Sequence, residues 1–110
     1  MKARSSQLQN TLDLLVLKTL AARGALHGYA IVNHIQTAAE EELRVEEGSL
    51  YPALHRMESE GWVASEWTVS ATNRRIKLYR ITAAGRKQLA REQESWERLS
   101  RAVTRVLRFT

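Results

Sequence analysis

The spacing of apolar residues changes at Gly61, and this change constrains the fold more than any other feature of the sequence. Before Gly61, apolar residues recur every three or four positions in three segments, as on one face of an α-helix. After it, residues 62–69 and 75–81 are rich in aromatic and β-branched side chains, which predicts two short strands. Helical spacing returns at Thr82 and continues to Arg108. The sequence therefore predicts three helices, a β-hairpin and a long last helix.

The third helix is the best marked of the three. Its core face is predicted from apolar residues spaced by four and three, namely Leu50, Leu54 and Met57. A proline is best tolerated in the first turn of a helix, so Pro52 predicts a start at Gly48 or Ser49, with Ser49 as the N-cap. Gly61 is expected to end this helix.

Three helices followed by a two-stranded hairpin form the winged helix-turn-helix arrangement, in which the third helix enters the DNA major groove. We therefore expect a mainly α fold with a two-stranded β-wing. Residues 1–82 are predicted to form the DNA-binding domain, and residues 83–110 a C-terminal dimerisation helix.

The free face of the third helix and the wing supply the candidate DNA contacts. On the helix these are Ser49, Tyr51, Pro52, His55 and Arg56, and on the wing they are Asn73, Arg74, Arg75 and Lys77. The wing residues are expected to contact phosphates or a narrow minor groove, whereas Ser49, His55 and Arg56 are expected to read bases. Arg74 and Arg75 have an alternative interpretation as solvated turn residues. Lys2 and Arg4 could extend onto the DNA backbone or belong to an untethered tail.

The formal net charge of +5 and the pI near 10.1 favour a polyanionic partner. The charge is uneven along the chain, with 5 basic and 6 acidic residues in residues 1–47 and 7 basic and 3 acidic residues in residues 82–110. Arg86 and Lys87 lie beside the wing and could touch phosphate. The other basic residues of the last helix are expected to form a solvated face.

Enzyme classes are disfavoured by what the sequence lacks. It has no cysteine, no glycine-rich phosphate loop and no nucleophile with a neighbouring base. Three histidines, His27, His34 and His55, have no third ligand to complete a metal site, so we expect neither a metal nor another cofactor. No uncharged apolar run is long enough for a signal peptide or a membrane span, and we expect a soluble intracellular protein.

The last helix carries an apolar seam with near-heptad spacing, formed by Leu89, Trp96, Leu99, Val103 and Val106. A helix of roughly 40 Å with such a stripe needs a partner, which predicts a homodimer. Trp96 is expected either to stack on the partner chain or to line a pore that binds an effector. Trp62 and Trp67 could form a pocket for a flat ligand, but packing of the wing on the core is the favoured interpretation.

Several strings occur in the order seen in one family of bacterial regulators. They are Thr11-Leu12-Asp13-Leu14-Leu15-Val16-Leu17, Leu26-His27-Gly28-Tyr29-Ala30-Ile31, Gly48-Ser49-Leu50-Tyr51-Pro52-Ala53-Leu54-His55-Arg56-Met57-Glu58, Gly61-Trp62 and Tyr79-Arg80-Ile81-Thr82-Ala83-Ala84-Gly85. From about Leu8 to Leu89 the chain thus resembles the PadR family of transcription regulators, in its short subfamily with one C-terminal helix.

The resemblance implies a cytoplasmic homodimer, usually a repressor, whose C-terminal helices swap across the dimer. It also implies that Tyr51 meets the DNA backbone, and that a small aromatic or hydrophobic effector binds between the last helices. The alternative function is a winged-helix module that binds proteins and not DNA. Such modules usually lack the basic residues that this wing retains.

Overall fold

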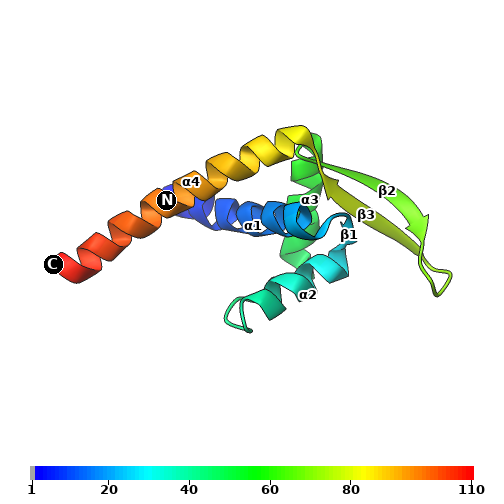
Figure 1. Cartoon of the computed structure of the whole chain (residues 1–110), viewed down its shortest axis with the longest axis horizontal. Coiled ribbons are helices and arrows are strands. Elements are labelled where there is room, and N and C mark those ends of the chain that lie inside the picture. Colours follow the sequence, from blue (N-terminus) through cyan, green and yellow to red (C-terminus); the bar gives the residue numbers. More distant parts are fainter. Residues whose placement is uncertain (1) are drawn as a thin grey trace.

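The computed structural model describes residues 2–110, and it describes the side chains of residues 11–110. Four helices and three strands follow one another along the chain: α1 Lys2–Arg23, β1 Leu26–His27, α2 Gly28–Ala38, α3 Glu47–Ser59, β2 Val63–Val69, β3 Arg75–Ile81 and α4 Ala83–Phe109. The predicted fold class is confirmed. The molecule measures 57 × 29 × 26 Å, and its long dimension follows from α4, which extends beyond the other helices (Figure 1).

The helix α1 lies at the centre and contacts α2, α3, α4 and β3 (Figure 1). Its residues Val16, Leu17 and Leu20 are almost fully buried. The predicted core face of α3 joins them, because Leu50, Leu54 and Met57 have no exposed area. This packing fixes which side of α3 remains outside.

The hairpin forms as the alternation predicts, with Trp67 opposite Lys77 and Val69 opposite Arg75 in an antiparallel register. A strand that the sequence did not reveal, β1, pairs with the other edge of β3 and places Leu26 opposite Tyr79. The sheet order is therefore β1-β3-β2. The added strand ties the wing to the start of α2.

Two helix starts can be compared with the sequence. The side chain of Thr82 accepts a hydrogen bond from the Gly85 backbone N–H at 3.0 Å, so Thr82 caps α4, whose helical spacing was predicted to begin there. The predicted start of α3 was wrong, since the helix begins at Glu47 after Glu46, and Ser49 lies inside it.

Pro52 consequently lies in the second turn of α3 and not in the first. It cannot donate a hydrogen bond to the carbonyl of Gly48, one turn earlier. Gly48 is exposed, so water can reach that carbonyl, and this solvation makes the proline tolerable.

Candidate nucleic-acid interface

The exposed face of α3 carries four of the five residues that were expected to contact DNA. The exposed residues are Ser49, Tyr51, Pro52 and His55, and 45% of the area of Tyr51 is accessible to solvent. A phenol, an imidazole and a hydroxyl on one free face can donate and accept hydrogen bonds without rearranging the core.

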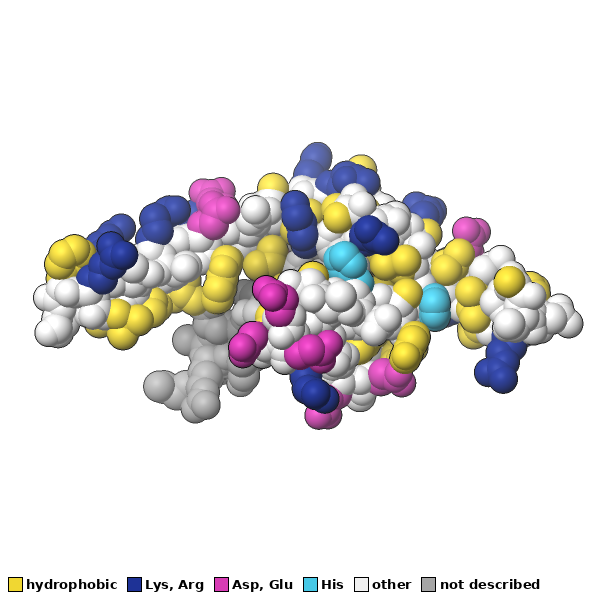
Figure 2. Space-filling model, turned by 60° about the horizontal axis from the view of Figure 1, so that its bottom comes forward, with side chains coloured by type: hydrophobic (Ala, Val, Ile, Leu, Met, Phe, Trp, Pro, Cys, Tyr) yellow, Lys and Arg dark blue, Asp and Glu magenta, His cyan; other side chains and the backbone are white. Residues whose placement is uncertain are grey.

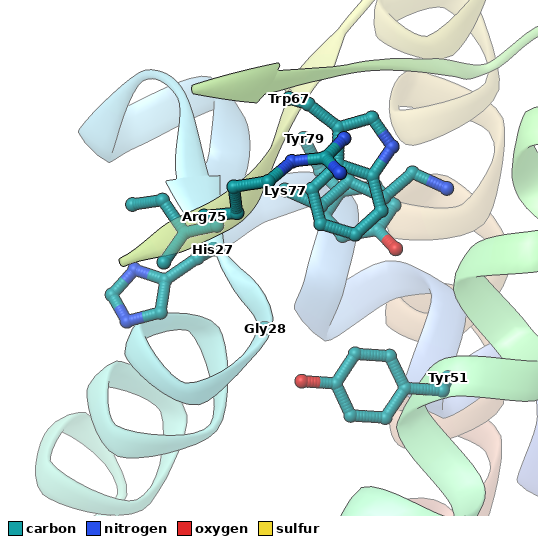
Figure 3. Close-up of a pocket in the computed structure, with 8 residues that line it drawn as sticks. His27, Gly28, Tyr51, Trp67, Arg75, Lys77 and Tyr79 are labelled. Atoms are coloured by element: carbon teal, nitrogen blue, oxygen red, sulfur yellow. The ribbon is translucent and has the colours of Figure 1, made fainter. Parts of the chain in front are cut away.

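Tyr51 is held in place by the first residue of α2. A Cβ atom at Gly28 would lie 2.5 Å from the Tyr51 hydroxyl oxygen and 2.7 Å from Cζ, so only a glycine leaves room for the ring there. Figure 3 shows the ring lying beside Gly28 at the start of α2. This role of Gly28 was not predicted from the sequence, although the glycine stands in one of the strings that carry the family resemblance.

The wing presents its cations on an aromatic platform. Arg75 Cζ lies 4.7 Å from the centre of the Trp67 ring, and Lys77 Nζ lies 5.8 Å from the same ring. Lys77 Nζ is also 5.6 Å from the Tyr79 ring and 3.9 Å from Glu58 Oε1. Stacking on aromatic rings restricts these long side chains and leaves their charge available to an anion.

These groups border a groove of about 400 Å³ between α3, the start of α2 and the wing (Figure 3). It is lined by His27, Gly28, Tyr51, Trp67, Arg75, Ile76, Lys77 and Tyr79. Burial raises the pKa of the Tyr79 phenol, with smaller contributions from Glu58 and Tyr51, so Tyr79 stays neutral at physiological pH. The groove therefore offers two cations, aromatic faces and a free phenol, which suits a phosphodiester backbone.

Trp67 corrects one sequence expectation. The residue is 59% exposed and belongs to the groove, so the interpretation of Trp67 as wing-to-core packing was wrong. Trp62 does pack against the core, as expected. The two residues differ because Trp62 precedes the hairpin, whereas Trp67 lies beyond the part of the sheet that α3 covers.

The wing turn projects Asn73 and Arg74 into solvent. Asn73 has a φ of 62°, and the turn closes through hydrogen bonds from Asn73 N to Ser70 O (2.9 Å) and from Arg74 N to Ser70 Oγ (3.1 Å). Neither Arg74 nor Arg75 forms an ion pair with any residue whose side chain is described. Both guanidinium groups are available to an external anion.

Arg56 has a different position from the other candidates. Its Nη1 and Nη2 donate to Asp13 Oδ2 and Oδ1 at 2.9 and 2.7 Å, and the Asp13 side chain is only 3% exposed. These hydrogen bonds raise the pKa of Arg56, and the charges of Asp13, Glu60 and Glu92 add to the effect. The guanidinium group is thus held by a buried carboxylate, while each terminal nitrogen keeps a second N–H, so the role of Arg56 in reading bases stays a prediction.

The seam of α4 divides into two parts. Leu89 was expected at the dimer interface. It is 9% exposed and belongs to the core of its own chain, so this expectation was wrong. Leu99 is half-buried, whereas Trp96, Val103 and Val106 are 46%, 47% and 61% exposed. Leu107, which the seam spacing did not include, extends this apolar stripe, whereas Phe109 lies beside the arginines of α4. Figure 2 shows it along one side of α4, with basic side chains on the other.

The remaining sequence candidates are not brought into the groove. Arg86 and Lys87 are exposed near the start of α4, and the side chains of Lys2 and Arg4 lie outside the described residues. Over the described part of the chain, no group of three or more His, Asp or Glu side chains could hold a metal ion. Within the same residues, no helix is sufficiently long and apolar to traverse a bilayer.

Comparisons with known proteins agree with this architecture. The model of the transcriptional regulator PadR-like family matches residues 16–91. Transcriptional regulator Rv3488 of Mycobacterium tuberculosis is 37% identical over 83 residues, which cover 76% of this chain and 74% of that protein.

Among solved structures, a transcriptional regulator from Clostridium thermocellum is 28% identical with a TM-score of 0.80, covering 89% of this chain and 94% of its own. A PadR family transcriptional regulator from Eggerthella lenta is 32% identical with a TM-score of 0.76, covering 99% of this chain and 93% of its own. The family match takes in all of the winged-helix core from Val16 to the first turns of α4, and on this ground the chain belongs to the PadR-like family of transcriptional regulators.

Proposed function

We propose that this protein is a sequence-specific DNA-binding repressor that binds a palindromic operator as a homodimer. The groove between Tyr51 and the stacked cations of the wing is the observation that carries the proposal. In a helix-turn-helix protein the recognition helix enters the major groove, and the position of this groove between α3 and the wing supports a phosphate backbone there. A winged-helix module that binds only proteins would have no use for unpaired arginines at this edge.

Different residues have different tasks in this proposal. Arg74, Arg75, Lys77 and Tyr51 contact phosphates, with Asn73 supporting the wing tip, and they supply affinity for any sequence. Ser49, Pro52 and His55 face the floor of the major groove, where a hydroxyl and an imidazole distinguish bases. Residues 1–82 therefore bind DNA, and the part of residues 83–110 beyond Leu89 joins two copies.

The second copy follows from the apolar stripe of α4. Exposure of Trp96, Val103 and Val106 to water is unfavourable in free energy. In the homodimer, the α4 of the second copy covers these residues. A small aromatic or hydrophobic effector would bind between the paired helices at Trp96 and release the DNA. Such a regulator acts beside the chromosome in the cytoplasm and performs no catalysis.

Selection of bound duplexes from a random pool tests the proposal. We expect an enriched palindrome whose half-sites are separated by about one helical turn, 10–10.5 base pairs, or a multiple of it. The enriched duplex should bind at least about a thousandfold more tightly than a scrambled duplex at the same salt concentration. Recovery of random sequences, or of none, would contradict the proposal and favour the protein-binding alternative.

Repression and the effector need separate measurements. In transcription assays with purified polymerase, an operator that overlaps the promoter should reduce transcript yield when the protein is added. A panel of planar hydrophobic compounds is then screened for quenching of tryptophan fluorescence and release of the duplex, with Trp96→Phe as the comparison. Compounds that release DNA equally from both proteins would place the effector elsewhere.

A further inference from the structure

A polar cluster joins α3 to α1 through an ion pair, and a carboxylate on α4 adds the effect of its charge. Asp13 on α1 accepts two hydrogen bonds from Arg56 on α3, and both oxygens of its carboxylate are used. These two residues are 43 positions apart in sequence. A bidentate arginine–carboxylate pair is planar, so it fixes direction as well as distance.

The third member of the cluster comes from α4. Glu92 is 9% exposed, it accepts a hydrogen bond of 2.7 Å from Gln88 Nε2, and its charge acts on Arg56. Glu92 occupies a position between Leu89 and Trp96, where the heptad spacing calls for an apolar residue. The positive charge of Arg56 lowers the free-energy cost of burying a carboxylate at that position.

Besides the contacts of Glu58 with Ser65 and Lys77 of the wing, the remaining attachment of α3 to the other helices is apolar. Leu50, Ala53, Leu54 and Met57 hold it from behind, and contacts of this kind tolerate small rotations and slides of a helix. Base readout requires side chains to be placed within about 0.5 Å and 10–20° of the productive geometry. The pair with Asp13 supplies the directional restraint that the apolar contacts lack.

We propose that Arg56 is a positioning residue for DNA binding: through Asp13 it sets the orientation of Tyr51 and His55 without touching DNA. This inference rests on the proposed function, and it replaces the role in base readout that the sequence suggested.

The test compares variants in affinity, salt dependence and amide exchange. Arg56→Gln removes the paired charge, and Asp13→Asn keeps an acceptor of the same shape. Arg75→Gln serves as the matched variant that loses a direct phosphate contact. Ile35→Val, a small deletion in the core of α2 away from the cluster, controls for a general loss of stability.

At a temperature where every variant is folded, we expect Arg56→Gln and Asp13→Asn to raise the Kd for the selected duplex by about tenfold. Their effects should not add in the double variant, since both break one pair. The slope of log Kd against log salt should stay at the wild-type value for both, whereas Arg75→Gln should reduce it by about 0.9. Arg56→Lys, which keeps the charge but not the bidentate geometry, should recover only part of the affinity.

A slope that falls for Arg56→Gln as it does for Arg75→Gln would show a phosphate contact and overturn the inference. An unchanged Kd for both Arg56→Gln and Asp13→Asn would reduce the pair to a stabilising role and also overturn it. Hydrogen exchange of the free protein gives a readout that needs no DNA. Amides of α3 should exchange faster in Asp13→Asn than in Ile35→Val, even if the wild-type protein binds no duplex and the proposed function fails.

Discussion

At the scale of single residues, the contact between Gly28 and Tyr51 is the most sensitive point of the groove. Gly28→Ala would place a methyl group within 2.5–2.8 Å of the Tyr51 ring. Because the ring is the far end of a side chain that can swing, the expected result is displacement of Tyr51 and not unfolding. We expect the Kd for duplex DNA to rise about tenfold, corresponding to the loss of about one charge-assisted hydrogen bond, while the unfolding midpoint changes little.

A double-variant comparison separates this mechanism from a direct effect of the methyl group. In a Tyr51→Ala background, Gly28→Ala should have no further effect on affinity, since the displaced ring is already gone. Titration of labelled duplex by fluorescence anisotropy measures the Kd of Gly28→Ala in the wild-type and in the Tyr51→Ala background. A further loss in that background would mean that Gly28 itself approaches the DNA.

Tyr79 gives a pH dependence whose sign is fixed by its burial. Its pKa is raised in the folded protein above the value of about 10 expected in the unfolded chain. The stabilisation from the neutral phenol is thus complete below pH 10 and is lost as the pH rises through the higher folded pKa. Urea unfolding should show that the free energy of unfolding falls more between pH 8 and pH 10.5 for the wild type than for Tyr79→Phe. The exposed Tyr29→Phe serves as control and should behave like wild type.

Two arginines show where the local sequence was sufficient to predict their surroundings and where it was not. Arg75 and Arg56 are both arginines next to apolar residues, yet one stacks on Trp67 and the other pairs with Asp13. The partner of Arg75 lies across a hairpin whose register alternation predicts. The partner of Arg56 lies 43 positions away on another helix, and no local spacing indicates it. Of the groove lining, the sequence therefore indicated the cations Arg75 and Lys77 and the phenol of Tyr51, but not the aromatic platform of Trp67.

At the scale of elements, the junction between the wing and α4 depends on Thr82. Its hydroxyl donates toward Gly61 O at 2.6 Å and Trp62 O at 3.0 Å, which bifurcates one hydrogen, and it accepts from Gly85 N. We expect Thr82→Ala to lower the free energy of unfolding by about 1–2 kcal/mol, as for the loss of an N-cap. Thr82→Ser, which retains the hydroxyl, should lose far less. Equal losses in chemical denaturation would assign the effect to the methyl group.

The elements themselves were predictable to different degrees. Residues 75–81 are rich in aromatic and β-branched side chains, and β3 was predicted with its observed bounds. The two residues of β1 were missed, because a strand this short is defined by its pairing with Leu78 and Tyr79 and not by its own pattern. The start of α3 was misplaced because Pro52 was expected in the first turn, where no hydrogen bond is lost. Pro52 lies in the second turn, and the exposed position of Gly48 lets water replace the hydrogen bond that its carbonyl lacks.

At the scale of the whole molecule, the two parts of the α4 seam should respond differently to substitution. Trp96→Asp places a charge on the exposed stripe and should separate the proposed dimer. Losing one buried aromatic on each protomer costs about 2 kcal/mol per copy, so dimerisation should weaken by about a thousandfold or more. Sedimentation velocity should show a monomer, with Arg98→Gln on the basic side of α4 remaining dimeric. A Trp96→Asp dimer would contradict this assignment.

Leu89 shows what the spacing of apolar residues in an amphipathic helix does not predict. Periodicity indicates that a face is apolar, but it does not say whether the covering surface belongs to the same chain. Only the crossing of α4 over α1 reveals that Leu89 is covered internally while Trp96 is not (Figure 1). Leu89→Ala should lower stability by about 2–5 kcal/mol, as for other leucine deletions in a core.

The central claim is that the wing and α3 together hold a DNA strand through phosphate contacts. The most direct test is a salt series of duplex titrations with wild type, Arg74→Ala and Arg75→Ala, with Arg98→Ala as a control far along α4. We predict that the slope of log Kd against log salt falls by about 0.9 for each wing variant and stays unchanged for Arg98→Ala. Wild-type slopes in both wing variants would contradict the account.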